Sequence, residues 1–138
     1  IVHDASVNLS LLATTDVIFI CTPIALIIPT VKELIPHLSA NTILTDVGSV
    51  KAPIVEAMTP LWSNFIGGHP MAGTAESGLD AALANLFVDR PYVLTPVETT
   101  PLESVKTVEA IARSLGSKLY LSRPEAHDKA VAWISHLP

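Results

Sequence analysis

Residues 67–74, with the sequence GGHPMAGT, place the titratable side chain of His69 among glycine and other small residues, at the end of an apolar run. Glycine allows a ligand or another backbone segment to approach closely. The ordinary pKa of histidine lies near neutrality, so its ring can accept or donate a proton at working pH. The stretch therefore predicts an acid–base site at His69. The alternative is a structural histidine at a strand end, and the elements around it must decide between the two.

Alternating strand and helix patterns position this stretch. Short apolar runs predict five strands, at residues 16–21, 42–47, 64–68, 92–95 and 118–121. Apolar residues spaced by helical turns predict helices between them, and Pro124 opens a last helix. Such alternation predicts an α/β fold with a doubly wound, mainly parallel sheet. The helical stripes are Ile27, Val31, Leu34 and Leu38; Ile54, Met58, Leu61 and Trp62; and Val105, Val108, Ala112 and Leu115.

Proline, serine and glycine mark the expected helix ends. Pro29 falls near a first helical turn, where its missing N–H costs little, and Pro36 should kink or end that helix. Ser49 stands where an N-cap would stand. Residues 100–103 have capping-box spacing, and Gly116 ends the helix that they begin.

Three turns fall at the carboxyl ends of predicted strands, at residues 21–23, 47–49 and 68–70. Ligands of open α/β sheets bind at the carboxyl ends of the strands. We therefore expect the three turns to line one crevice. This convergence favours the chemical role of His69 over the structural one.

Composition excludes several classes of function. The net charge is −5 and the basic residues are scattered, which disfavours nucleic-acid binding. The mean hydropathy of +0.48 indicates strands buried on both faces, while Pro23 and Pro29 interrupt the longest apolar run and exclude a membrane span. The single cysteine, Cys21, is expected to be a buried thiol in a reducing, cytoplasmic compartment.

The usual cofactor and metal motifs are missing from the sequence. His127 and His136 are nine positions apart, a spacing that does not place both on one helix face, so no metal site is expected. A dinucleotide fold normally opens with a strand and a G-x-G-x-x-G turn, and the sequence has neither before its first predicted strand. Either the chain is an internal fragment, or it is not a dinucleotide enzyme.

Three motifs together resemble the prephenate and arogenate dehydrogenases of tyrosine biosynthesis. They are residues 45–51 (TDVGSVK), residues 67–74, and the pair His127-Asp128 followed by residues 134–138 (ISHLP). The resemblance is strongest to the cyanobacterial type, around residues 21–23 and 132–136. It implies a partial Rossmann-like domain at residues 1–122 and the start of a helical dimerisation domain at residues 123–138.

The resemblance also implies an activity, oxidative decarboxylation of a cyclohexadienol with hydride transfer to a nicotinamide. His69 matches the catalytic general base, and Ser49 matches a serine that orients the substrate hydroxyl and the nicotinamide, although a plain N-cap would use the same oxygen. The remaining matches are Thr74, Ser135 and His136 near the substrate, and Thr22, Pro23, Val47, Gly48 and Ser49 near the cofactor.

The cyanobacterial likeness favours NADP over NAD and arogenate over prephenate, and the family implies a homodimer. The family's substrate-binding arginine belongs to the helical domain, so Arg90, Arg113 and Arg123 are expected to be surface charges. Two other functions stay open. One is a related hydroxy-acid-type dehydrogenase, which a lysine-centred substrate helix would favour. The other is a non-catalytic α/β module for binding or assembly.

Overall fold

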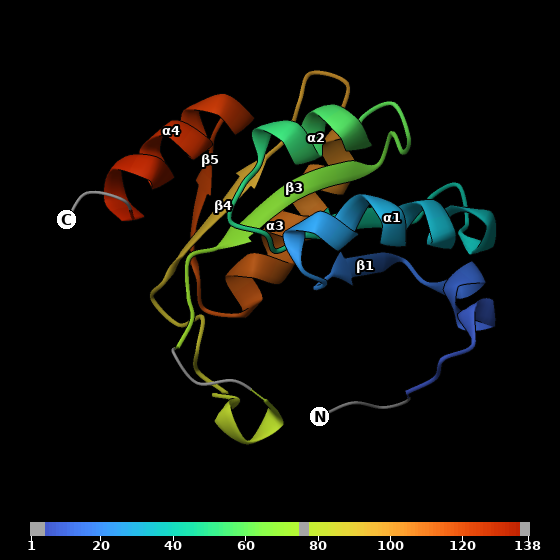
Figure 1. Cartoon of the computed structure of the whole chain (residues 1–138), viewed down its shortest axis with the longest axis horizontal. Coiled ribbons are helices and arrows are strands. Elements are labelled where there is room, and N and C mark those ends of the chain that lie inside the picture. The colour runs from blue at the N-terminus through green and yellow to red at the C-terminus, as the bar shows by residue number, and fades with distance from the viewer. Residues whose placement is uncertain (1–4, 75–77, 136–138) are drawn as a thin grey trace.

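A five-stranded sheet in the order β1-β2-β3-β4-β5 forms the centre of the computed structural model, which describes residues 5–74 and 78–135 (Figure 1). All five predicted strands are present, and the pairs β1–β2, β2–β3 and β4–β5 are parallel. The prediction of a mainly parallel sheet is confirmed. The strands are β1 (Val17–Ile20), β2 (Ile43–Asp46), β3 (Phe65–Pro70), β4 (Pro91–Thr95) and β5 (Lys118–Leu121).

The pairing of β3 with β4 is antiparallel, with His69 opposite Val93 and Gly67 opposite Thr95. A parallel neighbour needs a crossover, usually an α-helix. In its described part, the connection between these strands holds only the short 3-10 turn η3 (Leu79–Ala81). The chain therefore returns beside β3 in the opposite direction. His69 also lies within β3, rather than in an open turn after it.

Helices cover both faces of the sheet, as a doubly wound fold requires. Helices α1 (Ile24–Leu34) and α2 (Ala52–Met58) lie on one side and α3 (Leu102–Ser114) on the other (Figure 1). Residues adjacent in β2, Ile43 and Leu44, belong to opposite cores, because successive side chains of a strand point to opposite faces. The last helix, α4 (Pro124–Ser135), contacts α2 and β4.

Two helices differ in length from the sequence prediction. Pro29 lies inside α1, a full turn beyond its start, and α1 ends at Leu34, just before Pro36, as predicted. A 3-10 turn, η2 (Ile35–His37), continues the chain, and another, η1 (Leu9–Thr14), precedes β1. Helix α2 stops at Met58, so Leu61 and Trp62 pack against the core from the following turn.

Neither predicted side-chain cap forms. Lys51, not Ser49, is the N-cap residue of α2, and no side chain of its own caps that helix. Pro101 is the N-cap of α3, while the hydroxyl of Thr100 accepts a hydrogen bond from the N–H of Val97 at 3.0 Å. Gly116 follows the end of α3 with φ +79°, a conformation that favours glycine, so that helix end is confirmed.

The expectation of a buried Cys21 is wrong. Strand β1 ends at Ile20, and Cys21 is exposed in the turn that follows. Within residues 5–74 and 78–135, no helix is long and apolar enough to cross a bilayer.

Candidate functional site

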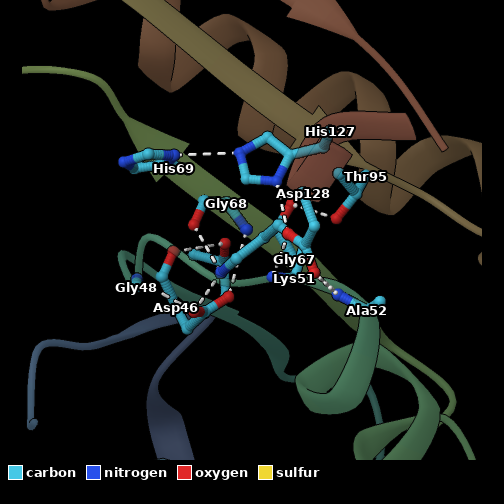
Figure 2. A network of polar contacts seen from close by, with 11 residues as sticks. Asp46, Gly48, Lys51, Ala52, Gly67, Gly68, His69, Thr95, His127 and Asp128 are labelled. Carbon is cyan, nitrogen blue, oxygen red and sulfur yellow. Dashed lines mark hydrogen bonds and ion pairs between the residues drawn. The ribbon is translucent and has the colours of Figure 1, made fainter. Parts of the chain in front are cut away.

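A fully buried ion pair joins Asp46, the last residue of β2, to Lys51 at the start of α2 (Figure 2). The Lys51 ammonium also donates to the carbonyl oxygen of Gly68 at 2.8 Å. The two Asp46 carboxylate oxygens accept from the backbone N–H of Gly68 at 3.1 Å and of Gly48 at 2.9 Å. The pair therefore fastens β2, α2 and β3 together at the carboxyl edge of the sheet.

Close packing leaves this pair no room for an added side chain. A Cβ atom on Gly68 would lie 2.6 Å from the carbonyl oxygen of Asp46, and one on Gly67 would lie 2.4 Å from the Thr95 hydroxyl. The glycines of residues 67–68 are thus required by the close packing of β3 against β2, β4 and α2.

Burial lowers the pKa of the Lys51 ammonium, and the neighbouring Asp46 carboxylate counteracts that effect.

A second polar chain starts at His69 in β3 and runs into α4 (Figure 2). Nδ1 of His69 lies 2.9 Å from Nε2 of His127, and Nδ1 of His127 lies 2.8 Å from a carboxylate oxygen of Asp128. The Asp128 carboxylate also accepts the backbone N–H groups of Lys51 at 2.7 Å and Ala52 at 2.8 Å. Asp128 thereby supplies the cap of α2 that the sequence pattern assigned to Ser49.

The half-buried ring of His69 is neutral at neutral pH. Burial, the nearby His127 ring and the Lys51 charge lower its pKa to about 4, although Asp128 acts in the opposite direction. One of its ring nitrogens faces His127, and Figure 2 shows the other on the far side of the ring. Within the described residues, this Nε2 atom has no hydrogen-bond partner. A neutral ring with an unpaired nitrogen is suited to accept a proton.

The predicted cofactor-side residues follow β1 and β2 at the same edge. Thr22 and Pro23 come directly after β1, and Pro23 is the N-cap of α1. The Thr22 hydroxyl is buried and has no partner among the described residues. Residues 47–49 follow β2, with Ser49 exposed. Because β1, β2 and β3 are parallel, these turns and His69 share the carboxyl edge. That they line one crevice stays a prediction.

The predicted substrate residues are less closely gathered. Thr74 is exposed and borders a cavity of about 480 Å³, together with Met71 and the exposed Arg90. Ser135 ends α4, but its side chain is not described, and His136 lies outside the described residues. Another cavity, of about 340 Å³, lies between β5 and α4 and is lined by His127 with mainly apolar neighbours. Arg113 and Arg123 are exposed, as expected.

The sequence reasoning missed the functions of Asp46, Lys51 and Asp128. The carboxylate and ammonium of the ion pair flank the turn at residues 47–50, and each stands at the boundary of an apolar element. Charged residues at such boundaries are a signal for a buried pair, but the partner of Asp128 cannot be found that way. Asp128 is 77 positions from Lys51, so only the folded chain brings them together.

The open, mainly parallel sheet with helices on both faces, and with chemistry at its carboxyl edge, defines a Rossmann-like nucleotide-binding domain, the class found in NAD(P)-dependent dehydrogenases. Residues 1–121 match the family model described as prephenate dehydrogenase, nucleotide-binding domain. The chain belongs to the prephenate dehydrogenase family.

Solved structures and curated relatives agree with this assignment. The crystal structure of Synechocystis arogenate dehydrogenase is 57% identical, with a TM-score of 0.90 over 94% of this chain and 46% of that one. Prephenate dehydrogenase from Aquifex aeolicus, in complex with hydroxyphenyl propionate and NAD+, is 30% identical, with a TM-score of 0.88 over 95% of this chain and 47% of that one. Cyclohexadienyl dehydrogenase from Zymomonas mobilis is 33% identical over 89% of this chain and 43% of its own length. The chain thus spans less than half the length of these relatives, and the cyanobacterial likeness is confirmed.

The carboxyl edge fits part of a dinucleotide cofactor. The Thr22 hydroxyl, buried and without a partner among the described residues, and the turn at residues 47–49, which is exposed at Ser49, offer polar groups at the place where such sheets bind ligands. The G-x-G-x-x-G turn that binds the pyrophosphate is not among the 138 residues.

Proposed function

We propose that this chain carries the catalytic base of an NAD(P)-dependent dehydrogenase that oxidatively decarboxylates arogenate or prephenate. The single observation that carries the proposal is His69, neutral at neutral pH and with its Nε2 atom unpaired among the described residues, at the carboxyl edge of the nucleotide-binding sheet. The hydroxyphenyl propionate complex of the Aquifex aeolicus relative supports a ligand with a hydroxyl group on a six-carbon ring and a side chain that ends in a carboxylate.

In the proposed reaction, His69 accepts a hydrogen bond from the ring hydroxyl and takes its proton as the hydride departs. The nicotinamide supplies the hydride acceptor when bound. The carbon that bore the hydride becomes a carbonyl. The ring carboxylate then leaves as carbon dioxide, the electrons of the broken carbon–carbon bond complete the aromatic ring, and the carbonyl oxygen takes up a proton to become the phenol hydroxyl. Ser49 orients the hydroxyl, and the proposed substrate-binding residues are Thr74, Ser135 and His136. Thr22, Pro23, Val47 and Gly48 hold the nicotinamide side of the cofactor.

The finer assignments rest on the cyanobacterial relative. Its arogenate dehydrogenase name and 57% identity favour arogenate as substrate, and NADP is proposed as cofactor on the same resemblance. Initial rates with each pairing of arogenate or prephenate and NAD+ or NADP+ test both choices. A preference for prephenate with NAD+ would overturn them.

The organisation of the whole protein is also a proposal. Residues 1–122 form part of the nucleotide-binding domain, and residues 123–138 begin a helical domain through which a homodimer assembles, in the cytoplasm. The contact of α4 with α2 supports direct packing of the helical domain against the nucleotide-binding domain. We expect analytical ultracentrifugation of the protein, at the full length of its relatives, to show a dimer.

The alternative of a hydroxy-acid-type dehydrogenase predicted a lysine-centred helix at the crevice. Instead, His127 of α4 contacts His69 and is itself paired with Asp128, and Lys51 is buried in its ion pair. These contacts support the cyclohexadienol reading.

Replacement of the base tests the proposal most directly. His69→Asn in the protein at the length of its relatives should lower turnover by about 10²- to 10⁴-fold, because general-base assistance is lost. The dissociation constant of NAD(P)+, measured by fluorescence titration, should stay nearly unchanged. The matched control is His37→Asn, in the exposed 3-10 turn η2, which should keep normal turnover. Comparable turnover in both variants contradicts the proposal.

A further inference from the structure

Two histidine rings and one carboxylate form a continuous chain that fixes the position of every proton in it. The rings of His69 and His127 meet edge to face, with centroids 5.1 Å apart and an interplanar angle of 77°. They meet through Nδ1 of His69 and Nε2 of His127, 2.9 Å apart. Two bare nitrogens cannot form a hydrogen bond, so one of them must carry the proton.

The Asp128 carboxylate decides which nitrogen that is. Hydrogen bonds from Ala52, His127 and Lys51 lower the pKa of Asp128, although burial opposes them, so the group is an ionised acceptor at neutral pH. The proton between Asp128 and His127 therefore belongs to Nδ1 of His127. In a neutral His127 ring, Nε2 is then a bare acceptor, and Nδ1 of His69 must donate to it.

We infer that Asp128 is a positioning residue, which acts through His127 to hold His69 as the Nδ1–H tautomer and so keeps the lone pair on Nε2, the nitrogen that faces away from α4. A free imidazole in water prefers the opposite tautomer, with the proton on Nε2. Without the chain of contacts, most His69 rings would present an N–H to the substrate hydroxyl. The inference rests on the proposed function of His69 as the base and adds how that base is prepared.

The same chain also spreads the charge that the reaction creates. When Nε2 of His69 takes a proton, the ring becomes an imidazolium, and its Nδ1–H faces Nε2 of His127. Transfer of that proton would place the positive charge on His127, 2.8 Å from the Asp128 carboxylate. An opposite charge at such a distance stabilises the protonated form. The Asp128 carboxylate thus offsets part of the loss of proton affinity that burial causes at His69.

Asp128 also caps α2, so the experiment must separate this structural role from the positioning role. Asp128→Asn and Asp128→Ala form the matched pair. In the Asp128→Asn variant, the amide oxygen is expected at the present Oδ1 position, where it meets two donors, while the NH2 group faces only the N–H of Ala52. The Asn substitution therefore keeps an acceptor for His127, and the Ala substitution does not.

The tautomers are measured by long-range ¹H–¹⁵N correlation spectra of the protein labelled only at histidine, at neutral pH. We expect His69 and His127 to be Nδ1–H in the native protein and in Asp128→Asn. In Asp128→Ala, His127 should take the Nε2–H form and donate to Nδ1 of His69. Both histidines then change from the Nδ1–H to the Nε2–H tautomer. His69→Asn and His127→Phe assign the signals.

The native spectrum alone can overturn the inference, even if Asp128→Ala does not fold. A native His69 that is mainly Nε2–H contradicts it, as does a folded Asp128→Ala with unchanged tautomers. In the enzyme at full length, kcat should fall by about tenfold or more in Asp128→Ala, with KM little changed, because the wrong tautomer of the base is presented. Asp128→Asn should restore most of kcat, because its amide oxygen still accepts from His127. If the spectra show the wrong tautomers while His69→Asn is inactive, this inference is refuted and the proposed function stands. If His69→Asn is active, the proposed function itself is refuted.

Discussion

The Asp46–Lys51 ion pair and the chain from His69 through His127 to Asp128 are two polar networks at the same edge of the sheet. In the first, both side chains are 0% exposed, and their partners are one another and the backbone of residues 48 and 68. The second ends at a ring nitrogen that the described residues leave unpaired. The first network is closed and the second is open at one end.

This difference separates a structural function from a chemical one. In the closed network, the charges of Asp46 and Lys51 hold strand and helix ends in place. Removal of either charge would leave the other buried without a partner, at a large cost in stability. The open network uses a ring that is uncharged at neutral pH and only half-buried, so a ligand can reach it without breaking the fold. The predictions below test that division, beginning with the largest effect.

Lys51→Met should break the closed network. The change leaves the Asp46 carboxylate buried without its cation, and loss of one partner of a buried pair costs about 3–5 kcal/mol. Urea denaturation monitored by circular dichroism measures the loss. Lys106→Met is the control, because the Lys106–Glu103 pair is exposed and should contribute less than about 1 kcal/mol. Equal losses in the two variants would show that the buried pair is not a structural fastening.

Acidification should act on the open network. The pKa of His69 falls from 6.5 to about 4 on folding, so between these values the unfolded chain binds more protons and the folded state loses stability as the pH drops. We expect a loss of about 1–2 kcal/mol after allowance for solvent screening. The groups facing His69 are His127, Lys51 and Asp128.

Urea denaturation at several pH values across this window measures the effect. His69→Asn should flatten the dependence, because its side chain does not titrate. Stability that stays constant, or that rises as the pH falls from about 6.5 to about 4, would contradict a half-buried His69 ring that is neutral at neutral pH.

Ser49→Ala should have the smallest effect and sharpens the comparison from the other side. The cap of α2 comes from Asp128, so removal of the Ser49 hydroxyl should change the free energy of unfolding by less than about 0.5 kcal/mol. Asp128→Ala should cost about 1–2 kcal/mol, as loss of a cap usually does. Thermal unfolding of both variants tests whether Asp128 caps α2. A larger loss in Ser49→Ala than in Asp128→Ala would show that Ser49 is the cap.

Local patterns predicted much of the fold and part of the site. All five strands follow from short apolar runs, and the end of α3 follows from Gly116, because these features depend on neighbouring residues. The shared edge of His69 with Thr22 and residues 47–49 follows from strand direction. The sequence also predicted helix ends that the structure assigns differently, at Ser49 and Thr100.

The features that were missed depend on contacts between distant residues. The antiparallel return of β4 depends on what the segment after β3 forms, and residues 71–90 carry no strong periodicity. Asp128 reaches α2 only because α4 packs against α2 in the folded chain. The exposure of Cys21 depends on where β1 stops, a boundary that differs by a residue from the apolar run.

The sequence separations within the two networks also have a consequence for folding. The ion pair joins residues five positions apart, whereas the two histidine rings are 58 positions apart. Contacts between distant residues require a longer loop to close, and they generally form later than local ones. We expect the edge formed by β2 and α2 to assemble first, and His69 to acquire its partner only when α4 docks in the last step. Catalytic competence would then report completion of the fold, because a chain arrested before that step has a folded sheet edge but no ordered base.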